Sequence, residues 1–241
     1  MTALPSGNAP LHRDPDDDTL RLECGVCGVW GAPEDEASSI VALGLHALQH
    51  RGQEACGIAS VKSEMFHTER QRGLVGDVFG GADLSTRMPG EAAVGHTRYS
   101  TAGGSSDRNI QPMYADLDSG GIAIAHNGNL TNFLFLRNRL VSEGSIFQST
   151  SDSEVILHLI ARSRKAKIVD RFIDALGAIE GGYALVAQTR HKMIGARDPL
   201  GIRPLVLGRL GDAWVLASET CALDMMGATF VRDIEHGEVV V

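Results

Sequence analysis

The balance of apolar and polar positions divides the chain at Cys24. The first 23 residues begin MTALPSGNAPLHRDPDDDTL and are rich in Pro, Gly, Ser and Asp, a composition typical of a disordered tail. From Cys24 the sequence CGVCGVWG is small and apolar, as in a buried strand. We therefore expect a tail over 1–23 and a single globular domain over 24–241.

Apolar residues recur every three or four positions in four segments, the spacing that puts them on one face of a helix. Ser151 and Glu154 also have the spacing of a capping box, in which two side chains satisfy the first free N–H groups of a helix. The predicted helices cover 37–48, begin near Thr131, begin at Ser151, and cover 168–179.

Short apolar runs bounded by polar clusters predict strands. They start at Cys24 and Cys56 and cover 92–96 and 121–126. From Tyr183 the chain becomes a series of short strands between Gly and Asp turns, namely YALVAQ, KMIGA, PLVLGRL, AWVLAS, TFVRDI and EVVV. Strands, a helical middle and further strands indicate an α+β fold of layered sheets and helices.

Composition excludes several classes of protein. The 22 Lys and Arg residues against 30 Asp and Glu give a net charge of −8, whereas a nonspecific nucleic-acid binder shows a basic face. No apolar run approaches the roughly 20 residues that a membrane-spanning helix needs, and the N-terminus lacks the features of a secretory signal. We expect a cytoplasmic protein that binds neither nucleic acid nor membrane and keeps its four cysteines as free thiols.

Polar clusters near the predicted strand ends contain the candidate chemistry. A free amino acid such as glutamine needs a cation for its α-carboxylate and an anion for its ammonium. Its side-chain amide needs a nucleophile and two hydrogen-bond donors for the developing oxyanion. The residue types for these tasks are Arg98, Asp152, Cys24 and the pair Asn127–Gly128.

Each of these residues also has a structural interpretation. Arg98 could be a surface salt-bridge partner, and Asp152 could help to cap the following helix. Asn127–Gly128 could form a turn, because Asn-Gly suits positive φ angles. Cys24 and Cys27 form a CxxC pair, but no second pair of Cys or His residues completes a zinc site. We therefore predict no metal site in this domain.

Seven motifs, in order from Cys24 to the last residue, resemble those of a known family. They are CGVCGVWG, LQHRGQEACGIAS, GHTRYSTAGG, IAHNGNL, SIFQSTSDSEVILHLI, DPLGIRPL and ASETCALD. They look like the Ntn-type glutaminase domain of the glutamine phosphoribosylpyrophosphate amidotransferases, or amidophosphoribosyltransferases. Glucosamine-6-phosphate synthase shares the CG, HRG, HTRW-like and HNG motifs, but HRGQE and DPLGIRPL favour the purine enzymes.

The resemblance implies an Ntn-hydrolase fold, a four-layer α/β/β/α sandwich of two mostly antiparallel sheets. It also implies that the catalytic Cys24 begins the mature chain, so that 1–23 form a propeptide. A free α-amine with a pKa of about 7.7–8.0 can accept the thiol proton, whereas an amide nitrogen cannot. The chain is therefore expected to be inactive until the residues before Cys24 are removed.

The implied reaction is hydrolysis of glutamine to glutamate and ammonia through a Cys24 thioester. It is the ammonia-supplying half-reaction of phosphoribosylamine synthesis in de novo purine biosynthesis. By the same resemblance, the roles are these: Asn127 and Gly128 hold the oxyanion, Arg98 binds the α-carboxylate, Asp152 binds the α-ammonium, Thr101 and Tyr99 shape the pocket, and Arg51 and Gly52 lie beside the nucleophile. The resemblance also implies buried packing roles for Cys27, Cys56 and Cys221.

The family enzymes continue with a phosphoribosyltransferase domain, and no motif of that domain is found here. We expect no cofactor in this domain; Mg²⁺ and, in some relatives, an iron–sulfur cluster belong to the absent one. The expected partners are glutamine, a phosphoribosyltransferase domain or chain, and further copies in a homo-oligomer. Two alternatives are the glutaminase domain of another Ntn amidotransferase and a truncated, non-catalytic regulatory or oligomerisation domain.

Overall fold

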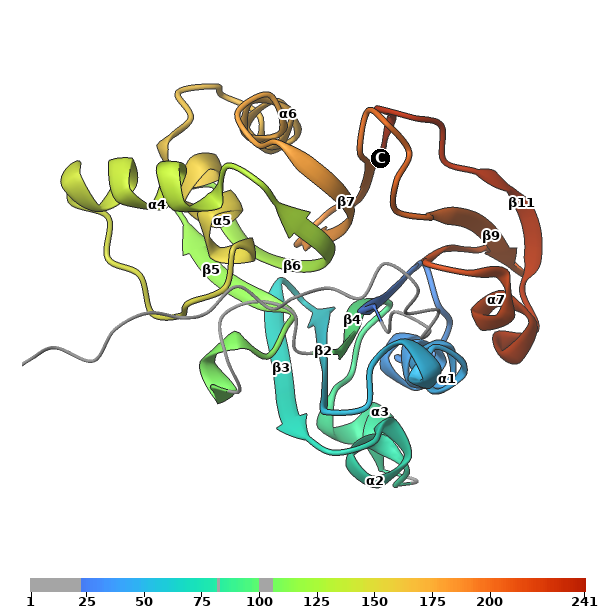
Figure 1. Cartoon of the computed structure of the whole chain (residues 1–241). Coiled ribbons are helices and arrows are strands. Elements are labelled where there is room, and N and C mark those ends of the chain that lie inside the picture. The colour runs from blue at the N-terminus through green and yellow to red at the C-terminus, as the bar shows by residue number, and fades with distance from the viewer. Residues whose placement is uncertain (1–22, 82, 100–105) are drawn as a thin grey trace, which may run out of the picture.

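The computed structural model describes residues 23–81, 83–99 and 106–241. Two antiparallel sheets lie face to face, and helices cover the outer face of each (Figure 1). The strand order is β11-β9-β10-β1-β4-β2-β3 in the first sheet and β12-β8-β7-β6-β5 in the second. In chain order the elements are β1 (Gly25–Trp30), α1 (Ala37–Ala47), the 3-10 helix η1 (Gln49–Arg51), β2 (Ala55–Lys62), β3 (Met65–Arg72), α2 (Val75–Phe79), α3 (Leu84–Arg87), β4 (Ala92–Arg98), the 3-10 helix η2 (Asp107–Asn109), β5 (Met113–Leu117), β6 (Gly120–Leu130), α4 (Phe133–Ser142), α5 (Ser153–Arg162), α6 (Ile168–Leu176), β7 (Gly181–Thr189), β8 (Met193–Arg197), β9 (Val206–Leu210), β10 (Ala213–Ala217), α7 (Thr220–Met226), β11 (Thr229–Asp233) and β12 (Val239–Val240).

Strand β1 shows how the two-residue period of a strand sorts side chains between layers. Val26 packs in the layer between the sheets, whereas Cys27 and Val29 pack against the helices outside the first sheet. At Gly28 an added Cβ would lie only 2.7 Å from Cγ1 of Val186 in the second sheet. Because both faces of β1 are buried, the strand reads as a continuous apolar run.

The layer between the two sheets is built largely from small side chains. Ala59 of β2, Ala123 and Ala125 of β6, and Ala184 of β7 are fully buried there. Small residues allow the sheets to approach closely. Across this layer, Nε2 of His96 on β4 lies 3.2 Å from the carbonyl oxygen of His126 on β6.

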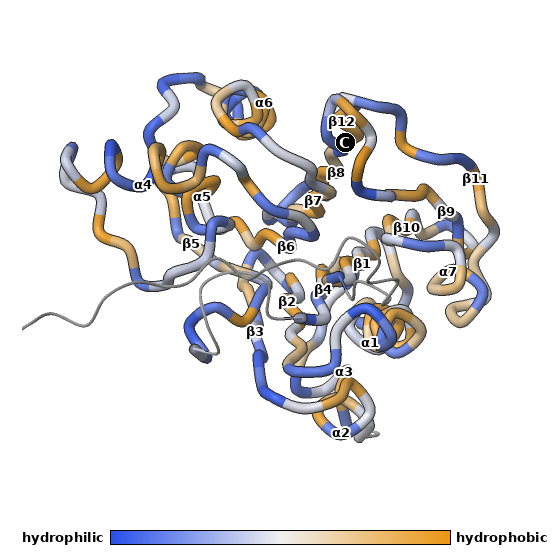
Figure 2. Tube along the Cα trace, in the orientation of Figure 1, coloured by the Kyte–Doolittle hydropathy of each residue, from blue (hydrophilic) through white to orange (hydrophobic). Residues whose placement is uncertain are grey.

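Two groups of helices complete the four layers. Helices α1, α2, α3 and α7 pack on the first sheet, and α4, α5 and α6 pack on the second (Figure 1). Hydrophobic positions recur along α1 and α6, whereas the edge strand β3 is largely hydrophilic (Figure 2). Burying a side chain as large as Phe172 of α6 contributes about 1.5–3 kcal/mol. The predicted α+β sandwich with α/β/β/α layers is confirmed.

Most predicted elements form, with small differences at their ends. The helix predicted over 37–48 ends at Ala47, and the one over 168–179 ends at Leu176. No helix among the described residues is long and apolar enough to span a bilayer. The elements that the apolar pattern missed are β3, β5, α2, α3 and α7.

The predicted capping box at the start of α5 is wrong. The N-cap residue is Asp152, and it makes no side-chain capping hydrogen bond. The Glu154 carboxylate instead accepts the backbone N–H groups of Gln148 and Ser149, at 2.8 and 2.7 Å. Glu154 therefore stabilises the loop before the helix.

Candidate active site

Cys24 directly precedes β1 and lies beside Tyr99, the residue that follows β4. Pairing of the two strands places Gly25 opposite Thr97, so that Sγ of Cys24 lies 3.5 Å from both the backbone N and the backbone O of Tyr99. Burial raises the pKa of the Cys24 thiol, and the hydrogen bond to Tyr99 and the charge of Arg98 oppose that effect. The thiol is therefore mostly protonated at neutral pH and needs a base to become a nucleophile.

The backbones of Arg98 and Gly52 lie against each other near Cys24. Arg98 is only 6% exposed, which makes the surface salt-bridge interpretation wrong, and its Nη1 donates to the Ser106 carbonyl oxygen at 3.1 Å. A Cβ on Gly52 would lie 2.6 Å from the carbonyl carbon of Arg98. Glycine thus allows the loop after η1 to cross directly over the Arg98 backbone.

Asn127 and Gly128 lie within β6, opposite Ala184 and Tyr183 of β7, so the turn interpretation is wrong. Asn127 is 1% exposed, and its Nδ2 has no hydrogen-bond partner among the described residues. A buried donor without a partner costs about 1–3 kcal/mol, so such a group is typical of a site that a ligand completes. Gly128 has a φ of +152°, and a Cβ there would lie 2.2 Å from the Gly182 carbonyl oxygen.

Asp152 is buried between α5 and the end of β6. Its Oδ2 accepts the backbone N–H of Leu130 at 2.9 Å, and its Oδ1 lies 3.7 Å from Nδ1 of His126. The carboxylate does not cap α5, so the capping interpretation is wrong. Its negative charge contributes to the raised pKa of Cys24, which places the carboxylate within electrostatic reach of the thiol.

Gln111, His126 and Ser153 form a buried hydrogen-bond network that no sequence motif predicted. Oε1 of Gln111 accepts the backbone N–H of His126 at 2.7 Å, and its Nε2 donates to Oγ of Ser153 at 3.1 Å. Oγ of Ser153 also lies 2.9 Å from Nδ1 of His126. The segment NIQP around Gln111 belongs to none of the motifs, so no sequence signal pointed to it.

Two buried histidines join the sheets behind Asn127. Nε2 of His96 lies 3.2 Å from the carbonyl oxygen of His126. Burial lowers the pKa of His96 to about 3, and burial also lowers the pKa of His126 although the charge of Asp152 opposes it. Both rings are therefore neutral at pH 7, so His126 supplies no positive charge beside the Asp152 carboxylate.

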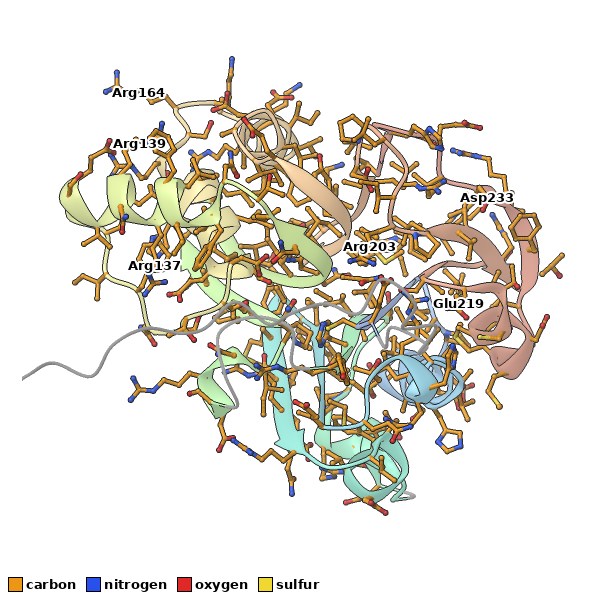
Figure 3. All side chains as sticks on the ribbon, viewed as in Figure 1. Arg137, Arg139, Arg164, Arg203, Glu219 and Asp233 are labelled. Carbon is orange, nitrogen blue, oxygen red and sulfur yellow. The ribbon has the colours of Figure 1, made fainter. Side chains whose placement is uncertain are left out.

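Arg51 connects the nucleophile to the residue before it. Nε of Arg51 donates to the carbonyl oxygen of Cys24 at 3.1 Å, and Nη2 lies 3.0 Å from Oε2 of Glu23. Nη1 of Arg51 pairs with Glu219, and Arg203 pairs with the other oxygen of Glu23. Arg203 lies on the loop between β8 and β9, and Glu219 directly precedes α7 (Figure 3). No role for Glu23, Arg203 or Glu219 follows from the sequence motifs.

The remaining predicted residues have three outcomes. Thr101 lies outside the described residues. Cys27 and Cys56 are fully buried in the core, as predicted, but Cys221 is only partly buried, because its thiol lies at the edge of α7, 3.6 Å from Glu219. No group of three His, Cys, Asp or Glu side chains in the described part of the chain is arranged to hold a metal ion.

Comparisons with known proteins identify the family and the fold of the chain. Residues 96–225 match the family model described as "Glutamine amidotransferase domain". The chain is 58% identical to an amidophosphoribosyltransferase of Rhizobium etli, over 98% of this chain and 47% of that protein. A solved structure of "the allosteric regulatory enzyme of purine biosynthesis" superposes with a TM-score of 0.85 at 46% identity, covering 90% of this chain and 46% of that one. The B. subtilis glutamine phosphoribosylpyrophosphate amidotransferase, complexed with ADP and GMP, gives a TM-score of 0.83 at 44% identity, with the same coverage.

The chain spans about half the length of the curated relatives that it matches. The family model begins at His96 and ends at Met225, so it includes Arg98, Asn127–Gly128 and Asp152 but does not reach Cys24, Arg51 or Gly52. The Ntn-hydrolase fold expected from the motifs agrees with these solved structures.

Proposed function

Since this chain belongs to the glutamine amidotransferase domain family, we propose that it hydrolyses glutamine to glutamate and ammonia, with Cys24 as the nucleophile. The observation that supports this most is that a buried guanidinium and a buried carboxylate both act electrostatically on the Cys24 thiol. Sγ of Cys24 contacts the Tyr99 backbone, and the charges of Arg98 and Asp152 both act on this thiol. A cation, an anion and a thiol together suit an amino acid that carries a reactive side chain.

Activation of Cys24 requires a base. Burial holds the thiol pKa above its ordinary value, so the fraction of thiolate at neutral pH is small. We propose that the α-amine of Cys24 takes the proton, because a terminal amine has a pKa of about 7.7–8.0. In the chain as written this nitrogen is an amide joined to Glu23, which has no such basicity. The chain is then an inactive precursor until the residues before Cys24 are removed.

The thiolate next attacks the side-chain amide carbon of glutamine. The carbon–sulfur bond forms as the carbonyl oxygen takes up negative charge. The Nδ2 of Asn127, which lacks a partner among the described residues, and the backbone N–H of Gly128 are the proposed donors to this oxygen. Collapse breaks the carbon–nitrogen bond, and the nitrogen leaves as ammonia after accepting the proton. Water then hydrolyses the thioester to glutamate and restores the thiol.

Arg98 and Asp152 would fix the orientation of the substrate. The guanidinium suits the α-carboxylate because it offers a planar set of donors, and the Asp152 carboxylate suits the α-ammonium. The neutral state of the neighbouring His126 leaves this negative charge available. Tyr99 would border the pocket, and Gly52 would hold the Arg98 backbone in place. A role for Thr101 in the same pocket stays a prediction.

The relatives suggest the wider role. We propose that the ammonia supplies phosphoribosylamine synthesis in purine biosynthesis, on a phosphoribosyltransferase domain or chain that also provides the Mg²⁺ site. Named relatives at 58% and 46% identity are amidophosphoribosyltransferases, which favours this role over other ammonia-transferring enzymes. Cytoplasmic location and homo-oligomer formation stay predictions.

The test is a reactive glutamine analogue followed by peptide mass spectrometry, which reports the N-terminus and the labelled atom together. The expected label is one adduct on Cys24, found only in chains that begin at Cys24. Cys24→Ala should abolish it, and Cys27→Ala, which changes a buried thiol three residues away, is the matched control that should keep it. Chains that begin at Cys24 and take no label would contradict glutaminase activity and favour a non-catalytic domain.

A further inference from the structure

We propose that Glu23 is the recognition residue for removal of the tail, and that Arg51 and Arg203 hold its carboxylate so that the Glu23–Cys24 peptide bond is fixed for cleavage. This Glu23 clamp, defined as Glu23 with Arg51 and Arg203, rests on the proposed function, because it concerns the maturation of Cys24.

Arg51 contacts both residues of the bond that must break. Its Nη2 lies 3.0 Å from the Glu23 carboxylate, and its Nε donates to the carbonyl oxygen of Cys24 at 3.1 Å. One guanidinium thus binds the side chain before the bond and the main chain after it. Its planar set of donors gives it a fixed geometry for both contacts. The two contacts therefore restrain the soft torsions on either side of the planar Glu23–Cys24 peptide bond.

Arg203 binds the second oxygen of Glu23. Arg51 also pairs with Glu219, but Glu23 is the only acidic side chain that pairs with Arg203 among the described residues. The side chains of Arg51, Arg203 and Glu23 are 11%, 21% and 31% exposed. Ion pairs with this degree of burial are screened by salt much less than surface pairs, so the carboxylate is held firmly.

The loop that carries Arg203 is rigid. The buried Asp198 accepts the backbone N–H groups of Leu200, Ile202 and Arg203, each at 3.0 Å. Nε of Arg197 donates to the carbonyl oxygen of Arg203 at 2.8 Å. The DPLGIRPL motif therefore builds a fixed platform for the Arg203 guanidinium. The platform therefore fixes where the Arg203 guanidinium meets the Glu23 carboxylate.

Cleavage consumes one water molecule. The carbon–nitrogen bond between Glu23 and Cys24 breaks, the water oxygen stays on Glu23 as a new carboxylate, and a hydrogen passes to the Cys24 nitrogen to make the amine. No oxidant or other reactant is needed. Glu23 leaves with the tail, so the clamp exists only in the precursor. Chains that have matured from any Glu23 variant are chemically identical to the wild type.

The experiment follows newly synthesised chain in a cell-free translation extract by intact mass. The wild type should convert to the form that begins at Cys24. Glu23→Ala and Glu23→Gln should lengthen the half-time at least about tenfold, the effect of about 1.4 kcal/mol on a barrier, and Glu23→Asp should lie between. Arg203→Gln should slow conversion as well. Glu143→Ala, which removes a glutamate paired with Arg162 on the surface, is the matched control and should mature at the wild-type rate.

Two results would overturn the Glu23 clamp: equal half-times for the wild type and Glu23→Ala, or a wild-type chain that never loses the tail. Thermal unfolding of the precursors, compared at equal concentration, separates slow cleavage from failure to fold. A chain produced to begin directly at Cys24 tests the proposed function separately. Glutaminase activity in that chain, together with equal half-times, would leave the function standing and remove only the clamp. Loss of activity in it would remove the function.

Discussion

The side chain of Gln111 holds the backbone of His126 at two points. Its Oε1 accepts the His126 N–H at 2.7 Å, and its Nε2 lies 3.4 Å from the His126 carbonyl oxygen. His126 directly precedes Asn127, and the same Nε2 donates to Ser153 beside Asp152. One amide therefore connects the strand that carries the proposed oxyanion donor to the first residue of α5, which directly follows the proposed ammonium ligand.

Replacement of this amide should affect both turnover and folding. In a chain that begins at Cys24, Gln111→Ala should lower kcat for glutamine hydrolysis at least about tenfold, because displacement of a reacting group by about 1 Å can cost 10²-fold. It should also lower the free energy of unfolding by about 1–3 kcal/mol, because the His126 N–H loses its acceptor. Steady-state kinetics and denaturant unfolding measure the two effects.

The matched control is Gln188→Ala. Gln188 is also fully buried, but it lies on β7 opposite Ala123, away from the candidate site. It should lose stability and keep its kcat. Equal kcat values for the two variants would show that Gln111 has only a structural role.

Asn127 should contribute to the transition state and little to substrate binding. Its Nδ2 has no partner among the described residues, so Asn127→Ala removes a donor without breaking a hydrogen bond of that nitrogen to any of them. We expect kcat to fall about 10²–10³-fold, as on loss of an oxyanion donor, with KM within a few-fold of the wild type. Asn129→Ala, at an exposed position two residues along the same strand, should leave both constants unchanged. A rise in KM with constant kcat would instead assign Asn127 to ground-state binding.

The sequence was informative where side-chain burial follows a regular period. Apolar residues at helical spacing gave α1 and α6 because one face of each packs on a sheet, and β1 reads as apolar because both of its faces are buried. Strand β3, MFHTERQR, is a largely exposed edge strand whose partner β2 supplies the pairing. Its polar residues carry no such signal, so its position depends on tertiary contacts.

The candidate site shows the same limit. Motif residues such as Arg98 and Asp152 could be selected by chemical type, but their common electrostatic effect on Cys24 depends on strand pairing and sheet stacking. Gln111 and Arg203 act through contacts across 15 and 180 positions of the chain. Contacts over such separations arise from the fold and leave no local pattern.

Gly52 should be needed for its lack of a side chain. Its φ of −159° is extended backbone that any residue can adopt, so the cost of Gly52→Ala comes from the 2.6 Å approach of the new Cβ to the Arg98 carbonyl carbon. Overpacking of this kind costs about 1–3 kcal/mol. Displacement of Arg98 should raise KM for glutamine about tenfold, which is the effect of about 1.4 kcal/mol.

A suitable control for Gly52 is Gly177→Ala. Gly177 has a φ of −67°, and its added Cβ would meet no atom closer than 3.5 Å. This variant should keep its KM and match or slightly exceed the wild-type stability, because alanine restricts the unfolded chain more than glycine does. An unchanged KM in Gly52→Ala would contradict the link between this glycine and the substrate carboxylate.

The buried histidines should make the fold sensitive to mild acid. The pKa of His96 is lowered to about 3 in the folded chain by burial, whereas in an unfolded chain a histidine has a pKa of about 6.5. Between these values the unfolded state binds a proton that the folded state does not. The free energy of unfolding is therefore at its full value above about pH 6.5. Below that pH it falls by about 1.4 kcal/mol per pH unit for each such histidine. His126, whose pKa burial also lowers, should steepen this fall in stability with decreasing pH.

Denaturant unfolding at intervals from pH 4.5 to 8 tests this. Below pH 6.5 the free energy of unfolding should change less steeply with pH for His96→Gln than for the wild type. The two proteins should show equal slopes above pH 7.5, where neither state takes up a histidine proton. Equal slopes below pH 6.5 would mean that His96 becomes protonated without unfolding, against its burial between the two sheets.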